Sequence, residues 1–148
     1  MKILVIHGPN LNMLGKREKS IYGEKTLHQI DAMLKKEAGA LNIEVYIFQS
    51  NHEGALIDFI QEQAASAGGI IINPGALTHY GFPLRDALVD SKLPVIEVHL
   101  SNIYSREEWR AKSVVAPVAI GQICGLGWKG YVIALHVLAG GPEFKSRG

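Results

Sequence analysis

The chain has 148 residues, of which 47% are hydrophobic and 20% charged, and its 15 basic and 14 acidic side chains leave a formal net charge of +1. This length and composition are typical of one globular domain with a complete apolar core, so we predict a single domain over residues 1–148. The balanced charge argues against nucleic acid or an anionic membrane as a partner. No segment approaches the roughly 20 consecutive apolar residues of a membrane span.

Cys124 is the single cysteine, so the chain cannot form an internal disulfide. It lies in an apolar stretch, and we expect a buried, reduced thiol in a cytoplasmic protein. A catalytic thiol is the alternative. The apolar run Ile3–Ile6 is too short for the core of a signal peptide, which favours the same compartment.

Short apolar runs rich in Val and Ile alternate along the chain with amphipathic stretches. Each run is nearly continuous rather than alternating, as in strands of a parallel sheet that helices cover on both faces. The predicted strands are Ile3–Ile6, Ile43–Phe48, Gly69–Ile72, Pro94–Val98 and Val118–Cys124.

Helices are predicted between and after these strands. Thr26 with Gln29 forms a capping box at the start of the first helix, and Ser50 with Glu53 forms a second box. Pro83 suits the first turn of the next helix. The last helix is indicated by apolar residues at helical spacing, Trp128, Tyr131, Val132, Leu135 and Leu138.

This alternation predicts a doubly wound α/β domain with a five-stranded parallel sheet and helices on both faces. The polar tail, residues 140–148, is expected to fray. In such folds a ligand binds beyond the carboxyl ends of the strands. Polar segments follow four of the predicted strands, which favours a small-molecule site there. These segments are His7–Asn10, Gln49–Glu53, Asn73–Gly75 and His99–Asn102.

Glu97 and His99 lie two residues apart at the end of a predicted strand. Side chains at this spacing share one face of the strand, so the carboxylate can hold the imidazole. A neighbouring carboxylate stabilises imidazolium and fixes its tautomer, which suits a general acid. A structural ion pair at a strand end is equally compatible with the pattern.

The connection over residues 11–25 is long and polar. Most such connections have about 2–6 residues, and longer ones often act as lids or binding loops. Tyr22 lies here with Arg17 nearby. A tyrosine ordinarily ionises at about pH 10, but a close cation stabilises its phenolate. Tyr22 is therefore a candidate base, and a surface tyrosine on a solvated loop is the alternative.

Other motifs give weaker signals. His79 could contact a ligand or cap a helix. The six histidines include no His-x-x-x-His pair and no Cys-His cluster, so we predict no metal site. The glycines of Gly121–Gly130 do not fit the dinucleotide fingerprint, which belongs after the first strand, and Gly8-Pro9-Asn10 is not a P-loop.

The ordered set of motifs resembles the type II 3-dehydroquinate dehydratases across nearly the whole chain. Single motifs are weak, but the full series in order is specific to that family. The matching pieces are Gly8–Asn12, Arg17-Glu18, Tyr22-Gly23, Gln49–Gly54, Asn73–Ala76, Thr78-His79, Arg85–Leu88, Ile96–His99, Ser101-Asn102, Arg106-Glu107, Arg110, Gly121–Ile123 and Gly125–Gly127.

The resemblance implies a flavodoxin-like fold and anti elimination of water from 3-dehydroquinate through an enolate, giving 3-dehydroshikimate without a cofactor. It implies that Tyr22 is the base, that Arg17 supports the phenolate, and that His99 is the acid. Glu97 would orient His99, and Asn10 would help to hold a water near the enolate oxygen. The implied substrate-binding residues are Asn73, His79, Asp86, Leu100, Ser101 and Arg110.

The resemblance also implies an assembly of trimers, a homododecamer, in which Asp86 reaches the site of a neighbouring subunit. The activity would serve the shikimate pathway of aromatic amino acid biosynthesis or quinate breakdown. The chain departs from the family pattern at Leu77, at Tyr80–Pro83, and at Lys19-Ser20, which replaces a usual proline and would make the lid looser. Exposed rings at Tyr80 and Phe82 would mark an interface, and rings that pack inward on their own domain are the alternative.

Two other classes fit the same predicted fold. One is a binding or signalling module such as a flavin carrier or a receiver domain. A receiver needs an acidic cluster after the first strand and an Asp after the third, where this chain has His7 and Asn73. A metal hydrolase is the other alternative.

Overall fold

The computed structural model describes residues 1–140 and contains one parallel sheet in the order β2-β1-β3-β4-β5. The chain moves outward from β1 to β2 and then returns to place β3 on the other side of β1, so the connections diverge and open a crevice at the carboxyl ends of these strands. This order is that of a flavodoxin-like sheet, as predicted. The strands are β1 (Lys2–His7), β2 (Glu44–Gln49), β3 (Gly69–Asn73), β4 (Val95–His99) and β5 (Gly121–Cys124).

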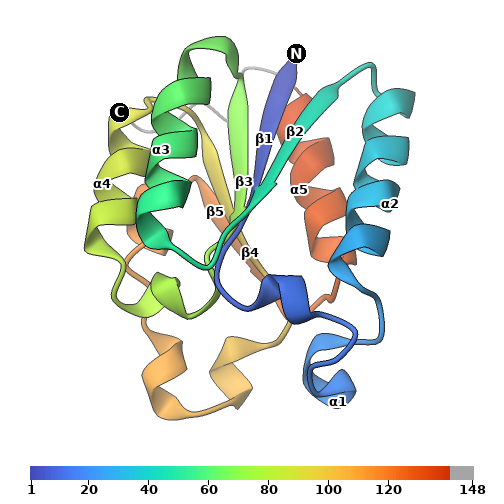
Figure 1. Ribbon diagram of the computed structural model, residues 1–148, viewed down its shortest axis with the longest axis vertical. Coiled ribbons are helices and arrows are strands. Elements are labelled where there is room, and N and C mark those ends of the chain that lie inside the picture. Colours follow the sequence, from blue (N-terminus) through green and yellow to red (C-terminus); the bar gives the residue numbers. More distant parts are fainter. Residues whose placement is uncertain (141–148) are drawn as a thin grey trace.

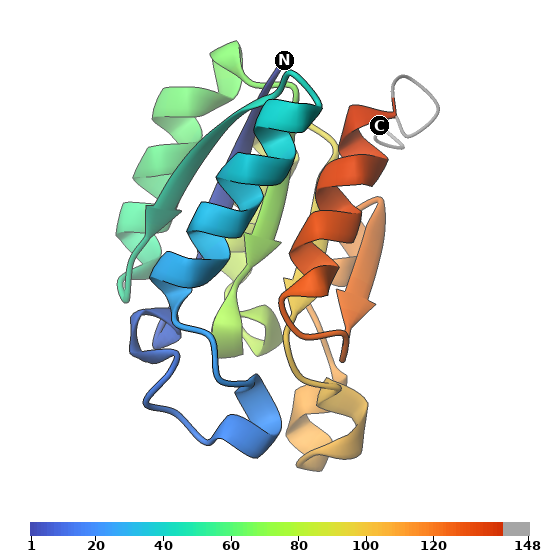
Figure 2. The same cartoon turned by 90° about the vertical axis from the view of Figure 1, so that its right-hand side faces the viewer.

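Helices cover both faces of the sheet (Figure 1). Helices α2 and α5 lie together on one face, and α3 and α4 lie on the other; Figure 2 shows the molecule from the side of α2 and α5. Within residues 1–140 no helix is both long and apolar enough to cross a membrane. The helices are α1 (Lys19–Tyr22), α2 (Leu27–Ala40), α3 (Glu53–Gln63), α4 (Phe82–Asp90) and α5 (Lys129–Ala139).

The three inner strands match the prediction of burial on both faces, and the two edge strands do not. Every residue of β3 and β4 is buried, whereas β2 alternates between exposed and half-buried positions and β5 is only half-buried. Cys124, on β5, is correspondingly half-buried rather than buried. The fifth strand also begins later than predicted, because Pro117 starts a 3₁₀ turn, Ala116–Val118, ahead of it.

One predicted capping box is confirmed and the other is wrong. Thr26 accepts the backbone N–H of Gln29, and the Gln29 side chain accepts the backbone N–H of Thr26. At α3, His52 precedes the helix, and the Glu53 carboxylate accepts the backbone N–H of Leu84 at the start of α4 instead. A tertiary contact therefore takes the carboxylate that the local motif assigned to the cap.

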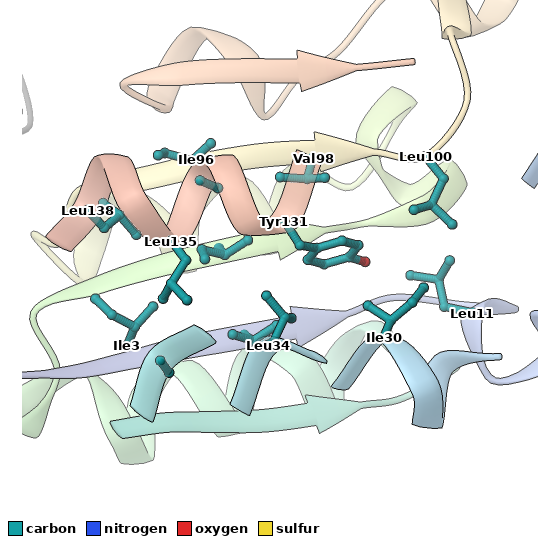
Figure 3. Packing of buried hydrophobic residues seen from close by; sticks show 14 of the residues in the cluster. Ile3, Leu11, Ile30, Leu34, Ile96, Val98, Leu100, Tyr131, Leu135 and Leu138 are labelled. Carbon is teal, nitrogen blue, oxygen red and sulfur yellow. The ribbon is translucent and has the colours of Figure 1, made fainter. Parts of the chain in front are cut away.

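A cluster of buried hydrophobic residues fills the space between the sheet and helices α2 and α5 (Figure 3). Tyr131 crosses this cluster, with its oxygen directed toward those strand ends. Its hydroxyl lies 2.9 Å from Nδ1 of His7, whose Nε2 lies 2.8 Å from Asp31. Burial raises the pKa of Tyr131, so its hydroxyl stays protonated. His7 is thus a fully buried core residue with both ring nitrogens paired.

The predicted fraying of residues 140–148 concerns positions that, apart from Gly140, lie outside the described residues. The departure at Tyr80–Pro83 places both rings outward, with Tyr80 62% and Phe82 56% exposed. Leu77, the other departure near His79, packs into the core instead.

Candidate active site

A cleft of about 130 Å³ lies at the carboxyl ends of β1, β3 and β4. The ends of β1 and β3 approach each other so closely that a Cβ on Gly8 would lie 2.4 Å from the carbonyl oxygen of Pro74. Only glycine permits that approach. The predicted site residues that line the cleft are Asn10, Arg17, Tyr22, Asn73, His79, His99, Leu100, Ser101 and Arg110.

Tyr22 ends the short helix α1 and is held by two guanidinium groups. Its hydroxyl oxygen accepts hydrogen bonds from Nη2 of Arg17 and from Nη2 of Arg106, each at 2.8 Å. The guanidinium carbon of Arg17 also lies 3.8 Å from the centroid of the tyrosine ring. Two guanidinium groups from different connections therefore meet at one phenolic oxygen in the cleft.

Glu97 and His99 form a buried pair at the end of β4, as their spacing predicts. Oε2 of Glu97 lies 2.5 Å from Nε2 of His99, and the glutamate side chain is fully buried. Ser113 Oγ donates to Oε1 at 2.7 Å, and Gln122 Nε2 donates to Oε2 at 2.7 Å. Burial alone would raise the pKa of Glu97, but the hydrogen bonds and charge of His99, with these two donors, lower it below its ordinary value. Glu97 is therefore a carboxylate, and Nδ1 of His99 remains for a ligand in the cleft.

The cleft walls carry polar groups with fixed orientations. Oδ1 of Asn73 accepts the backbone N–H of Gly75 at 3.1 Å. Nδ1 of His79 lies 2.7 Å from the carbonyl oxygen of Lys112, to which it donates, so Nε2 is left for another partner. The ring of Trp109 meets the His79 ring edge-on, with centroids 5.1 Å apart.

Two arginines beyond β4 complete the cleft. Nη1 of Arg106 donates to Ser101 Oγ at 3.1 Å, and its Nη2 contacts Tyr22. Nε of Arg110 donates to Glu107 at 2.7 Å, and only 18% of the Arg110 side chain is exposed. The sequence pattern indicates no role for Arg106, although Arg106 follows the polar end of β4 as Arg17 follows the polar end of β1.

The fold does not bring every predicted residue into this cleft. Asp86 is exposed on α4 and is not among the lining residues of its own chain. The residues at the end of β2 and just after it contact the loop that follows β1. Asn51 Oδ1 accepts the backbone N–H of Asn10, and Gln49 donates to the carbonyl oxygen of Gly8. His7 turns inward to the core.

The fold and the cleft define an α/β acid–base site, with a phenol between two cations and an imidazole on a buried carboxylate. Within residues 1–140 no group of three or more His, Cys, Asp or Glu side chains is placed to hold a metal ion. The Dehydroquinase class II family model matches residues 1–139, and the chain belongs to that family.

Relatives and solved structures agree with this assignment. A 3-dehydroquinate dehydratase from Roseiflexus castenholzii is 63% identical over 140 residues, covering 95% of this chain and 89% of the relative. One from Halothermothrix orenii is 57% identical, covering 93% of each chain. The crystal structure of a type II dehydroquinase from Butyrivibrio crossotus superposes with a TM-score of 0.91 at 53% identity, covering 93% of this chain and 97% of the other.

Proposed function

We propose that this chain is a type II 3-dehydroquinate dehydratase, which converts 3-dehydroquinate to 3-dehydroshikimate. The observation that carries the proposal is that one cleft holds a phenol between two guanidinium groups and an imidazole on a buried carboxylate. Elimination of water next to a ketone needs a base, an acid and a means to stabilise an enolate. Family membership and the names of the relatives support the same reaction.

In the first step, the Tyr22 phenolate takes the proton from the carbon alpha to the ketone. The electron pair of that C–H bond forms the enolate, with its negative charge on the former ketone oxygen. Arg17 and Arg106 stabilise the phenolate before the transfer. Asn10, at the rim of the cleft, would help to hold a water against the enolate oxygen.

In the second step, the enolate re-forms the ketone and its electrons expel the hydroxyl group on the neighbouring carbon. Nδ1 of His99 gives that oxygen a proton, so water leaves and the carbon–carbon double bond of the enone forms. Glu97 stabilises the imidazolium before this transfer and orients it. Tyr22 ends protonated and His99 neutral, so exchange with solvent restores both groups.

The remaining residues of the cleft suit a polyhydroxylated ring acid. Arg110 can clamp the substrate carboxylate through its two Nη groups, because only its Nε is engaged by Glu107. Asn73, His79, Leu100 and Ser101 would hold the ring. Asp86 would serve the cleft of a neighbouring subunit in a homododecamer built from trimers. We place the enzyme in the cytoplasm, in the shikimate pathway or in quinate breakdown.

A direct assay tests the proposal. The enone product absorbs in the ultraviolet, so turnover appears as rising absorbance when 3-dehydroquinate is added. We expect turnover that EDTA leaves unchanged, since the mechanism uses no metal. We also expect borohydride added with substrate to trap no adduct on the protein, since no amine takes part. A protein without turnover overturns the function, and a lysine adduct found by mass spectrometry overturns the enolate route.

A further inference from the structure

The carboxylate of Glu97 accepts hydrogen bonds from Gln122 and Ser113 in addition to the one that it shares with His99. Gln122 reaches it from β5, where the two residues are direct partners in the parallel ladder. The Nε2 atoms of Gln122 and His99 both contact Oε2, at 2.7 and 2.5 Å. Gln122 does not line the cleft, so its side chain acts through Glu97 rather than by contact with a bound substrate.

The orientation of the Gln122 amide is fixed from outside. Its Oε1 accepts a hydrogen bond from the hydroxyl of Tyr104 at 2.7 Å. Partial desolvation and the nearby Cys124 and Glu97 raise the pKa of Tyr104, so the phenol remains a donor. A tyrosine hydroxyl that donates here requires the amide oxygen to face it, and the amide N–H₂ then faces Glu97.

We propose that Gln122 and Tyr104 are positioning residues for the general acid, which keep the proton of the Glu97–His99 hydrogen bond on the histidine. A second donor on Oε2 makes that oxygen less basic, so the proton that it shares with His99 stays on Nε2. Tyr104 strengthens the effect because donation to one end of an amide polarises the N–H groups at its other end. The inference rests on the proposed function, in which His99 is the acid.

Other polar and titratable groups surround the Glu97–His99 pair. Ser113 holds the other oxygen, and Thr78 lies behind it, with Oγ1 2.9 Å from the Ser113 Oγ. Cys124 on β5 has its pKa raised to about 11, by burial first and then by the charge of Glu97, so it stays a neutral thiol. The cleft itself adds the titratable or charged residues Arg17, Tyr22, His79, Arg106 and Arg110.

Tyr104 also links the acid to the base. It lies in the turn Ile103–Ser105, two positions before Arg106, which contacts Tyr22. The same short segment therefore contacts the hydrogen-bond network of Glu97 on one side and the phenol on the other. Figures 1 and 2 both place this segment beyond the carboxyl ends of the strands, at the same end as α1.

Two substitutions and one control test the proposal. Gln122→Leu removes the donor to Glu97, and Tyr104→Phe removes one oxygen from a residue that is 58% exposed. Tyr46→Phe, on β2, makes the same change in a tyrosine that is 43% exposed and far along the sheet from the pair. The readouts are kcat, KM and the one-bond ¹⁵N–¹H coupling of His99 in protein labelled with ¹⁵N-histidine, assigned with His99→Ala.

We expect kcat to fall about tenfold in Gln122→Leu, as for one hydrogen bond to a charged group. We expect a fall of about threefold in Tyr104→Phe, as for a neutral hydrogen bond. KM should stay within about twofold of its original value, because neither residue lines the cleft. The coupling should decrease in both variants as the proton moves toward Glu97, and Tyr46→Phe should match the original protein.

The coupling separates this proposal from the proposed function. If the protein turns over 3-dehydroquinate but the coupling in folded Tyr104→Phe equals that of the original protein, the positioning role is wrong. A loss of kcat without a change in coupling also overturns it, since that pattern indicates a general structural effect. If the protein has no turnover, the proposed function fails, and the coupling still decides whether the network holds the proton. Should Gln122→Leu not fold, the surface change Tyr104→Phe decides alone.

Discussion

The two halves of the cleft hold their acidic groups in opposite ways. Tyr22 ends a four-residue helix, is only half-buried, and is held by guanidinium groups from two different connections. Glu97 lies in an inner strand, is fully buried, and is held by the neutral donors Ser113 and Gln122 as well as by His99.

The difference shows what each site requires of the fold. Full charges can stabilise an anion at a half-exposed position, where water lowers the cost of holding them. A buried carboxylate instead needs hydrogen-bond or charge partners, because a buried charge without them costs several kcal/mol. The proposed base therefore depends on how two loops meet, and the proposed acid depends on the packing of the sheet.

The largest effects are expected from removing the two groups proposed to transfer protons. Tyr22→Phe and His99→Ala should each lower kcat by about 10²–10⁴-fold. The two should differ in stability, because His99→Ala leaves the buried Glu97 without its partner, whereas Tyr22→Phe leaves no buried charge. Steady-state kinetics and thermal unfolding by circular dichroism measure both. A near-normal rate for Tyr22→Phe would remove Tyr22 as the base.

A smaller effect is expected from loosening the phenolate. Arg17→Ala should lower kcat by about 10–100-fold, no more than the roughly 10²–10³-fold cost of losing one oxyanion-hole donor, because Arg106 still holds the phenol. Arg17→Lys should recover part of the loss, since it keeps the charge without the planar fork. Lys16→Ala, on the exposed side of the same loop, is the matched control. Equal rates for Arg17→Ala and the control would mean that the base needs no help from Arg17.

The smallest effect is expected in the free energy of unfolding. It tests how much the buried carboxylate of Glu97 stabilises the fold. The pKa of Glu97 is lower in the folded chain than its ordinary value of 4.5. Its contribution to stability is therefore complete above that ordinary value and is lost as the pH falls through the folded-state value. Glu97→Gln should lower the free energy of unfolding at neutral pH by about 1–3 kcal/mol and flatten its decline in acid.

Urea unfolding at a series of pH values measures this prediction. Glu107→Gln is the control, because the Arg110 hydrogen bond also lowers the pKa of Glu107 but this carboxylate is exposed. Exposed pairs contribute little to stability, so the control should unfold like the original protein. Identical pH profiles for the two variants would show that burial gives Glu97 no special weight.

Features that follow from local geometry could be predicted from the sequence. Hydrophobic runs and helical spacing predicted the strands, the helices and their alternation. The Glu97–His99 pair was predictable because residues two apart on a strand share a face, whatever the rest of the chain does. The first capping box was predictable for the same reason, since Thr26 and Gln29 meet within one turn.

Contacts in which distant groups compete for the same partner could not be predicted and follow from the packing of the whole fold. The Glu53 carboxylate accepts the backbone N–H of Leu84, 31 residues away, and does not form the local cap. Arg106 donates to the hydroxyl of Tyr22, 84 residues away. No local pattern ranks such competitors, because the outcome depends on which elements the sheet order makes neighbours. The half-exposed edge strands and the buried His7 have the same origin. Composition alone does not tell which strand lies at an edge, or which polar side chain the core can pair.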